Sequence, residues 1–339
     1  MATVSVRRQF VSEGKVFYPQ GFNMRTLLPN DPVAFSHYTP EHRAMLASFG
    51  ANTLRFQVSQ SHIVDEAPDA IASYLRTISS VVDAARGDGF IVIVSCQHED
   101  PAGTVRRPVP VAATLDFWST IVPVFHSDHG VMFDVYNEPG FVATAEGWHQ
   151  WKHGGKGPAY PRIESVGHQQ LLNHIRDALG ARNVVILEGC RNGGQTGTLA
   201  GVPRITDPAN NTAFEVHKYH FETGREAWDH DFGHAAHRGQ GPVIVGEWSW
   251  GRQDCGTPKA ASAGPFLRYC RAHGVGVLGH HGDNLVSTDA DGSYCDTGKG
   301  SAWLYGFSRW MLGQDDPHTG GPQPARPPPS SPPKGAPRR

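Results

Sequence analysis

The chain has 339 residues, of which 18% are charged and 39% are hydrophobic, and its formal net charge is −2. This near-neutral balance argues against nucleic acid or an anionic membrane as a partner, and no segment approaches the roughly 18 consecutive apolar residues of a membrane span. The 5 cysteines show no CxxC spacing, which argues against a structural zinc site and against a disulfide scaffold.

The two ends of the chain are expected to differ from its middle. The first residues include Arg7 and Arg8 but no apolar segment, so the sequence predicts no signal peptide there. Residues 315–339 are rich in proline and basic residues and cannot bury enough apolar surface to fold. We therefore expect one folded domain over residues 1–314, followed by a disordered tail or linker.

Between these ends, short apolar runs alternate with amphipathic stretches. A first strand is predicted over 16–23, and further apolar runs follow it. These runs are 52–56, 90–95, 131–136, 183–187, 212–216, 242–245 and 274–278. Helical patterns are predicted over 39–50, 69–86, 112–126, 165–179 and 301–312.

The alternation predicts an α/β fold, a single-domain (β/α)8 TIM barrel. Near-continuous apolar strands are typical of a parallel sheet that is buried on both faces, and this number of strands separated by helices favours a barrel over a doubly wound sheet. The first predicted strand ends in Gly21-Phe22-Asn23 instead of a glycine-rich phosphate-binding turn. No nucleotide cofactor is therefore expected.

Polar residues directly follow several of the predicted strands. In a barrel of this kind the active site lies at the carboxyl ends of the strands, so these side chains are expected to converge. They are Arg55, His98, Asn137, Glu138, His217, Tyr219, Glu247, His280 and His281. The two carboxylates, Glu138 and Glu247, suit the cleavage of an acetal, which needs a proton donor together with a nucleophile or a base.

Two of these strand ends resemble the signature strands of glycoside hydrolase family 5, the cellulase-like retaining glycosidases of clan A. They read Val135-Tyr136-Asn137-Glu138-Pro139 and Val245-Gly246-Glu247-Trp248. The further matches are Arg55 in Asn-Thr-Leu-Arg-Phe, His98 in Ser-Cys-Gln-His, and His217-Lys218-Tyr219. The resemblance extends from the first to the seventh predicted strand and implies a retaining β-glycosidase.

The resemblance implies a role for each matching residue. Glu138 would be the acid/base and Glu247 the nucleophile, with the two carboxyl groups about 5–5.5 Å apart. Asn137 would bind the 2-hydroxyl of the sugar, and Arg55 and Tyr219 would keep Glu247 ionised and oriented. His98 and His217 would bind sugar hydroxyls or position the carboxylates.

The sequence departs from the family at the eighth predicted strand. The family usually places a tryptophan there, under the reacting sugar, whereas this stretch reads Val277-Leu-Gly-His-His-Gly-Asp283. His280 or His281 is expected to take that place, or Trp248 or Trp250 to supply the platform from the seventh strand.

The other tryptophans fall into two groups. Trp148 and Trp151 lie in the glycine-rich stretch after the fourth predicted strand and are candidates for stacking on sugars. Trp118, Trp303 and Trp310 lie in helical patterns and are expected in the core.

The leading interpretation is a retaining endo-β-1,4-glucanase that acts on a β-linked polysaccharide as a monomer, without metal or cofactor. A polymeric substrate implies secretion. The alternatives are a β-mannanase or another β-glycan hydrolase of the same family and, from a different class, a metal-dependent barrel hydrolase, for which His230, His234 and His237 are the candidate feature. A binding protein without catalysis is disfavoured by the intact carboxylate pair. A disulfide between Cys255 and Cys295 is left open.

Overall fold

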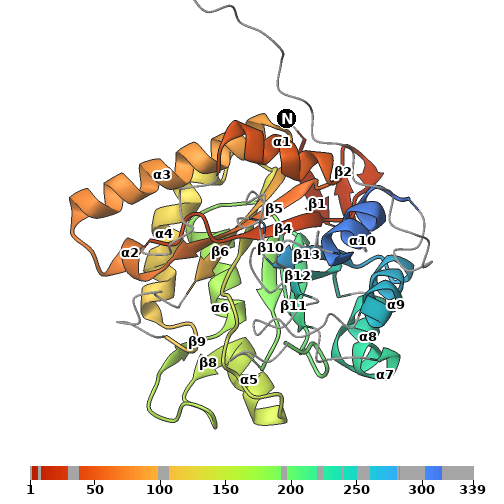
Figure 1. The fold of residues 1–339 in the computed structure, drawn as a ribbon. Coiled ribbons are helices and arrows are strands. Elements are labelled where there is room, and N and C mark those ends of the chain that lie inside the picture. The colour runs from red at the N-terminus through yellow and green to blue at the C-terminus, as the bar shows by residue number, and fades with distance from the viewer. Residues whose placement is uncertain are drawn as a thin grey trace, which may run out of the picture.

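The structure is a computed structural model that describes residues 2–6, 9–29, 38–97, 107–191, 197–219, 224–238, 240–249, 260–280, 282 and 302–314. Its centre is a closed barrel of parallel strands surrounded by helices (Figure 1). In order around the barrel, the strands are β4 (Gln20–Met24), β5 (Thr53–Ser59), β6 (Ile91–Gln97), β7 (Val131–Asp134), β10 (Val185–Glu188), β11 (Thr212–Tyr219), β12 (Val243–Ser249) and β13 (Gly276–His280). The predicted (β/α)8 barrel is confirmed.

Helices connect the strands and cover the outside of the barrel. They are α1 (Pro40–Ser48), α2 (Ser61–Val64), α3 (Pro68–Gly87), α4 (Ala112–Phe125), α5 (Ala145–His153), α6 (His168–Asn173), α7 (Arg225–Trp228), α8 (His234–Arg238), α9 (Ala260–Ala272) and α10 (Ala302–Met311). A π-helical turn over His174–Ala178 extends α6, and another over Asp229–Gly233 joins α7 to α8. The apolar pattern does not predict α5 or α9.

The boundaries of the predicted helices follow from local chemistry. At the start of α1 the Thr39 hydroxyl accepts a hydrogen bond from the His42 backbone N–H, and Pro40 takes the first helical position. Helix α3 buries Tyr74, Ile78 and Val82 on one face, at the helical spacing that the sequence predicts.

A small antiparallel sheet closes the amino-terminal end of the barrel. Its strands are β1 (Val4–Val6), β2 (Phe10–Ser12) and β3 (Lys15–Val16), and Val4, Val6 and Phe10 are buried in one cluster with inward-facing barrel residues. The expected strand over 16–23 is therefore divided, because Val16 belongs to β3 and the barrel strand begins at Gln20. A turn with positive φ at Glu13 and Gly14 folds β3 back onto β2.

The inside of the barrel changes from apolar to polar along the strands. Near the amino ends, Ile91, Met132 and Ile186 pack on the N-terminal strands. Towards the carboxyl ends, buried polar side chains replace them: Asn23, Arg55, Asp134, Glu188 and Glu215. Burying charged groups costs free energy unless they are paired, so this polar layer marks the end of the barrel where a site is built.

A second apolar layer lies between the strands and the helices. Trp118 and Trp310 are buried in it, as the sequence predicts, while the side chain of Trp303 lies outside the described part of the chain. None of the described helices is long and apolar enough to cross a membrane.

Two further predictions fall on residues that the structure does not describe. They concern the tail at 315–339 and the pairing of Cys255 with Cys295.

Candidate active site

Glu138 and Glu247 converge at the carboxyl end of the barrel. Glu138 follows β7, and Glu247 lies in β12. One oxygen of each carboxylate lies within 4.8 Å of the other and of a ring nitrogen of His217. This separation suits a nucleophile beside an acid/base, because two carboxyl groups that admit a water between them are typically roughly 6.5–9.5 Å apart.

The backbone of Glu138 is held in an uncommon conformation. Its φ is 47°, in the left-handed region that side chains other than glycine rarely adopt. Its N–H donates to Glu188 Oε2 at 2.6 Å, which fixes the turn after β7. The side chain of Glu138 is 15% exposed, whereas that of Glu247 is 4% exposed. Glu138 is thus the more accessible of the two carboxylates.

Hydrogen-bond donors surround the carboxylate of Glu247. The Tyr219 hydroxyl donates to Oε2 at 2.5 Å, Gln57 Nε2 donates to Oε1 at 2.8 Å, and Arg55 Nη1 donates to Oε1 at 3.1 Å. Charge-assisted bonds of this kind stabilise the ionised form and fix its orientation.

Two histidines lie close to the same carboxylate. His217 Nδ1 lies 3.7 Å and His280 Nε2 lies 3.6 Å from Glu247 Oε2. Burial alone would raise the pKa of Glu247, but the charges of His217, His280 and Arg55, with the hydrogen bond from Tyr219, hold it well below its ordinary value. Glu247 is therefore an ionised carboxylate at neutral pH.

Arg55 joins the buried acids below the two carboxylates. Its Nη2 donates to Asp134 Oδ2 at 2.7 Å and to Asn137 Oδ1 at 2.8 Å, and its Nε pairs with Glu215 Oε1 at 3.1 Å. Burial would lower the pKa of Arg55, but the surrounding carboxylates raise it above its ordinary value. The guanidinium is therefore a fixed cation that also orients the amide of Asn137.

His217 lies among carboxylates from its own strand β11, from β10 and from the turn after β7. Its Nδ1 is 3.0 Å from Glu138 Oε1 and 3.7 Å from Glu188 Oε1, and its Nε2 is 3.1 Å from Glu215 Oε1. Burial would lower the pKa of His217, but the carboxylates of Glu188, Glu247, Glu138 and Glu215 raise it well above its ordinary value. The surrounding carboxylates therefore favour a proton on this ring.

Three acids of the buried cluster around Arg55 and His217 are not predicted from the sequence: Asp134, Glu188 and Glu215. Glu188 directly follows the apolar run 183–187, so the rule that found Glu138 and Glu247 would also have found it. Asp134 and Glu215 interrupt apolar runs, and only the closed barrel decides that they point inward. Burial and the charge of Glu215 raise the pKa of Asp134 to about 6 against the effect of Arg55, and burial raises that of Glu188 well above its ordinary value.

Of the two histidines expected at the end of the eighth barrel strand, the structure describes His280. Its ring meets that of Tyr219 edge-on, with ring centroids 6.2 Å apart, beside Glu247. Three other predicted site residues lie outside the part of the chain that the structure describes: His98, Trp250 and His281.

The prediction that Trp248 forms a sugar platform is wrong. Its side chain is 1% exposed and packs between the barrel and the helices, stacked on Phe266 and tilted against Phe307. Successive residues of a strand point to opposite faces. Since Glu247 points into the barrel, its neighbour Trp248 points out.

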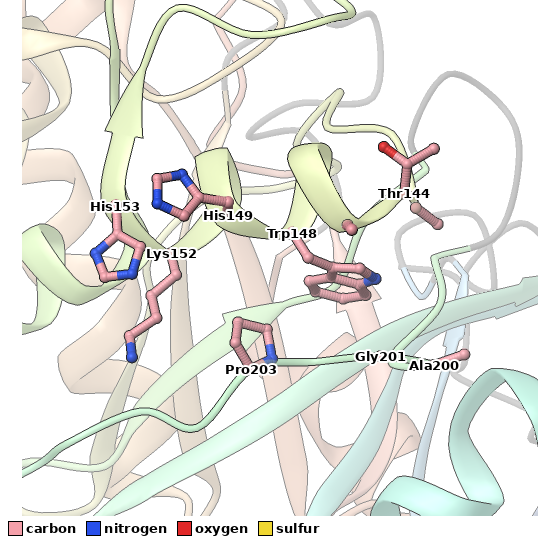
Figure 2. Close-up of a pocket in the computed structure, with 10 residues that line it drawn as sticks. Thr144, Trp148, His149, Lys152, His153, Ala200, Gly201 and Pro203 are labelled. Atoms are coloured by element: carbon pink, nitrogen blue, oxygen red, sulfur yellow. The ribbon is translucent and has the colours of Figure 1, made fainter.

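The two tryptophans of α5 differ in their surroundings. Trp151 is buried, donates its Nε1–H to the Glu188 carbonyl at 2.8 Å and stacks on His168, so its prediction as a sugar platform is also wrong. Trp148 lines a cavity of about 590 Å³ between α5 and residues 200–203 (Figure 2). Lys152 and Pro203 line the same cavity, and a role for Trp148 in sugar binding stays a prediction.

Among the described residues, two groups of side chains are close enough to hold a metal ion. They are Glu138, His217 and Glu247, and Glu188, Glu215 and His217. Both groups need a ring nitrogen of His217, and both ring nitrogens already face carboxylate oxygens at hydrogen-bond distance. Within the described residues, His230, His234 and His237 belong to no such group.

A parallel barrel with two carboxylates converging at its carboxyl end provides the pair of groups that the hydrolysis of a glycosidic bond requires. The chain matches the family Cellulase (glycosyl hydrolase family 5) over residues 14–284. It therefore belongs to glycosyl hydrolase family 5, as its strand-end motifs predict. No curated protein matches the chain.

Solved structures with the same fold include both glucanases and mannanases. A β-glucanase from Saccharophagus degradans in complex with cellotetraose has a TM-score of 0.64 at 18% identity, covering 92% of this chain and 94% of that one. The catalytic domain of a mannanase from Streptomyces sp. SirexAA-E has a TM-score of 0.60 at 18% identity, covering 87% and 83%. A β-mannanase from Streptomyces thermolilacinus with mannohexaose has a TM-score of 0.59 at 17% identity, covering 87% of each chain.

Proposed function

We propose that the protein is a retaining endo-β-1,4-glucanase with Glu247 as the nucleophile and Glu138 as the acid/base. The observation that carries the proposal is the contrast between the two carboxylates. Glu247 is buried among Arg55, Tyr219, Gln57 and two histidines, which keep it ionised. Glu138 lies within reach of it and is more exposed.

In this mechanism Glu138 protonates the leaving glycosidic oxygen while a carboxylate oxygen of Glu247 attacks the anomeric carbon. The covalent glycosyl-enzyme is then hydrolysed by a water that Glu138, now ionised, deprotonates. The Asn137 amide, whose oxygen is held by Arg55, is oriented to bind the sugar 2-hydroxyl. That bond strengthens as the oxocarbenium-like transition state forms.

The proposed substrate, a β-1,4-glucan, is supported by the comparisons with known proteins. The family description and the similar glucanase bound to cellotetraose support it. The mannanases of comparable similarity support a β-mannan as the alternative substrate. We further propose that residues 1–314 form one domain that acts as a secreted monomer.

The product stereochemistry tests the mechanism. On an aryl β-cellobioside, we expect the first-formed sugar to be the β-anomer, observed by ¹H NMR before mutarotation. The α-anomer as first product would contradict the covalent mechanism. Activity that is lost on chelation and restored by a divalent metal would instead support the metal-dependent alternative.

A substrate panel tests the substrate class. Carboxymethylcellulose, mannan, xyloglucan and laminarin are compared by the rate at which reducing ends form. We expect the highest rate on carboxymethylcellulose, with a fall in viscosity that precedes most of the release of reducing ends, because endo-cleavage shortens chains early. A preference for mannan would replace the glucanase assignment and leave the roles of the two glutamates in place.

The hydroxyl of Tyr219 is expected to control the acidic limb of the pH profile. Tyr219→Phe removes a hydrogen bond to ionised Glu247, so the pKa of Glu247 rises and the nucleophile is protonated at higher pH. The acidic limb of kcat/KM should move upward by about 1–2 pH units, since a hydrogen bond to a charged group is worth about 1.5–3 kcal/mol.

Tyr269→Phe is the matched control for this change. The Tyr269 hydroxyl donates to Asp229 Oδ1 at the same 2.5 Å, but Asp229 belongs to the turn after α7, away from the carboxylate cluster. In this variant the acidic limb of kcat/KM should stay at the wild-type pH. An equal movement in both variants would mean that the limb reports unfolding.

A further inference from the structure

The ring of His217 connects the proposed acid/base to a second, more deeply buried carboxyl group. Its Nδ1 faces Glu138 Oε1 at 3.0 Å and its Nε2 faces Glu215 Oε1 at 3.1 Å. A neutral imidazole has one donor and one acceptor nitrogen, so it cannot donate to two carboxylates at once. Either the ring is an imidazolium, or one carboxyl group carries the proton. The three groups therefore share protons as one unit.

The position of Glu215 is fixed from two sides. It precedes His217 by two residues in β11, so both side chains point into the barrel. Its Oε1 also pairs with Arg55 Nε at 3.1 Å, and both side chains of this pair are fully buried. The guanidinium offsets the charge of Glu215 and holds the oxygen that faces the ring.

The neighbouring strand leaves space for this carboxyl group. A Cβ atom on Gly246 would lie 1.8 Å from Glu215 Oε1, so any side chain at this position would have to displace the carboxyl group. Gly246 directly precedes Glu247, in a part of β12 whose pairing with β13 shifts register. The strand that carries the proposed nucleophile is thus shaped around Glu215.

We propose that Glu215 is a positioning residue for the acid/base. It holds the His217 ring with Nδ1 towards Glu138 and stabilises the proton that these two residues share. The inference rests on the proposed function, in which Glu138 must be protonated in the first step and ionised in the second.

The effect on pH dependence follows from the charges around the ring. Four carboxylates face His217: Glu138, Glu188, Glu215 and Glu247. Glu215 lies on the same strand as His217, and Glu247 lies on β12. Replacing Glu215 by a neutral group removes one of these negative charges. His217 and Glu138 then release their shared proton at a lower pH.

The variant Glu215→Gln tests this directly, because it keeps the shape of the side chain and removes its charge. We expect the basic limb of kcat/KM on an aryl β-cellobioside to move down by about one pH unit. Asp134→Asn is the matched control. Asp134 also pairs with Arg55 inside the barrel, but among the described residues it forms no ion pair or hydrogen bond with His217. Its basic limb should move by much less.

A measurement without substrate separates this inference from the proposed function. In ¹⁵N-histidine-labelled wild-type protein, with His217 assigned by comparison with His217→Gln, Nε2 should be protonated at a pH where exposed histidines are neutral. In Glu215→Gln that signal should shift. If Glu215→Gln fails to fold, Gly246→Ala serves as the second variant, because its side chain displaces the Glu215 carboxyl group. The Nε2 signal of His217 should then shift in the same direction.

Two results would overturn the proposal. One is a wild-type His217 whose Nε2 is unprotonated. The other is a folded Glu215→Gln variant with the wild-type basic limb and an unchanged Nε2 signal. Neither result bears on whether Glu247 is the nucleophile, which is tested separately by its own substitution.

Discussion

Glu247→Gly should lower kcat on an activated aryl β-cellobioside by at least about 10⁴-fold, the scale seen when a covalent nucleophile is removed. Sodium azide should then restore turnover, because the small anion fits the space left by the carboxylate. The product should be the α-glycosyl azide, with inverted configuration, since azide attacks from the side where Glu247 lay and no second displacement follows. Product analysis by NMR and the dependence of rate on azide concentration measure both effects.

Glu164→Gly is the control for this substitution. Glu164 is exposed in the segment before β9 (Ser165–Val166), so its loss should leave the rate on the same substrate unchanged. A Glu247→Gly variant that keeps a near-wild-type rate would rule out Glu247 as the nucleophile. An inactive, folded variant that azide does not rescue would argue for an inverting or metal-dependent reaction.

Glu138→Ala should have an effect that depends on the leaving group. Removing a general acid typically costs about 10²–10⁴-fold, and this loss should appear in full on unactivated cello-oligosaccharides. On a 2,4-dinitrophenyl β-cellobioside, whose leaving group needs no proton, the first step should be far less affected. The glycosyl-enzyme should then accumulate, because the base for the second step is missing.

Azide distinguishes this variant from Glu247→Gly. Here the anion should attack the covalent intermediate and give the β-glycosyl azide, with retained configuration. Equal losses of kcat/KM on activated and unactivated substrates, in a variant that is folded by circular dichroism, would contradict the role of Glu138. The opposite azide stereochemistry of the two variants would assign both glutamates within one set of measurements.

The balance of charge in the site explains why these two glutamates can differ so much. Arg55 and His217 lie among the acids, whose charges raise the pKa of both side chains. Glu247 receives most of the donors, whereas Glu138 keeps access to solvent. A pair of carboxyl groups with different environments is what general acid catalysis beside a carboxylate nucleophile requires.

Part of the site could be predicted because it lies at strand ends. A polar residue after a run of apolar residues stands out in a sequence, and parallel strands bring such residues to one end of a barrel. Arg55, Asn137, Glu138, His217 and Glu247 were found in this way. The barrel itself was predictable because strands buried on both faces leave continuous apolar runs.

Other features depend on which face of a strand points inward. Asp134 and Glu215 lie within apolar runs, and their burial beside Arg55 follows only when the barrel closes. The expectation for Trp248 failed for the same reason, since its neighbour Glu247 already takes the inward direction. The register shifts between β11, β12 and β13 at this point are not encoded in a pattern of period two.

The sequence by itself determined the fold class and the family and predicted the two glutamates, because these depend on the order of apolar runs and on the residues that end them. The tertiary structure decided the partners of those glutamates. The contact of His217 with Glu138, the pairing of Glu215 with Arg55 and the space that Gly246 leaves join residues from different strands. Such contacts are set by strand register and barrel closure, which no local stretch of sequence specifies.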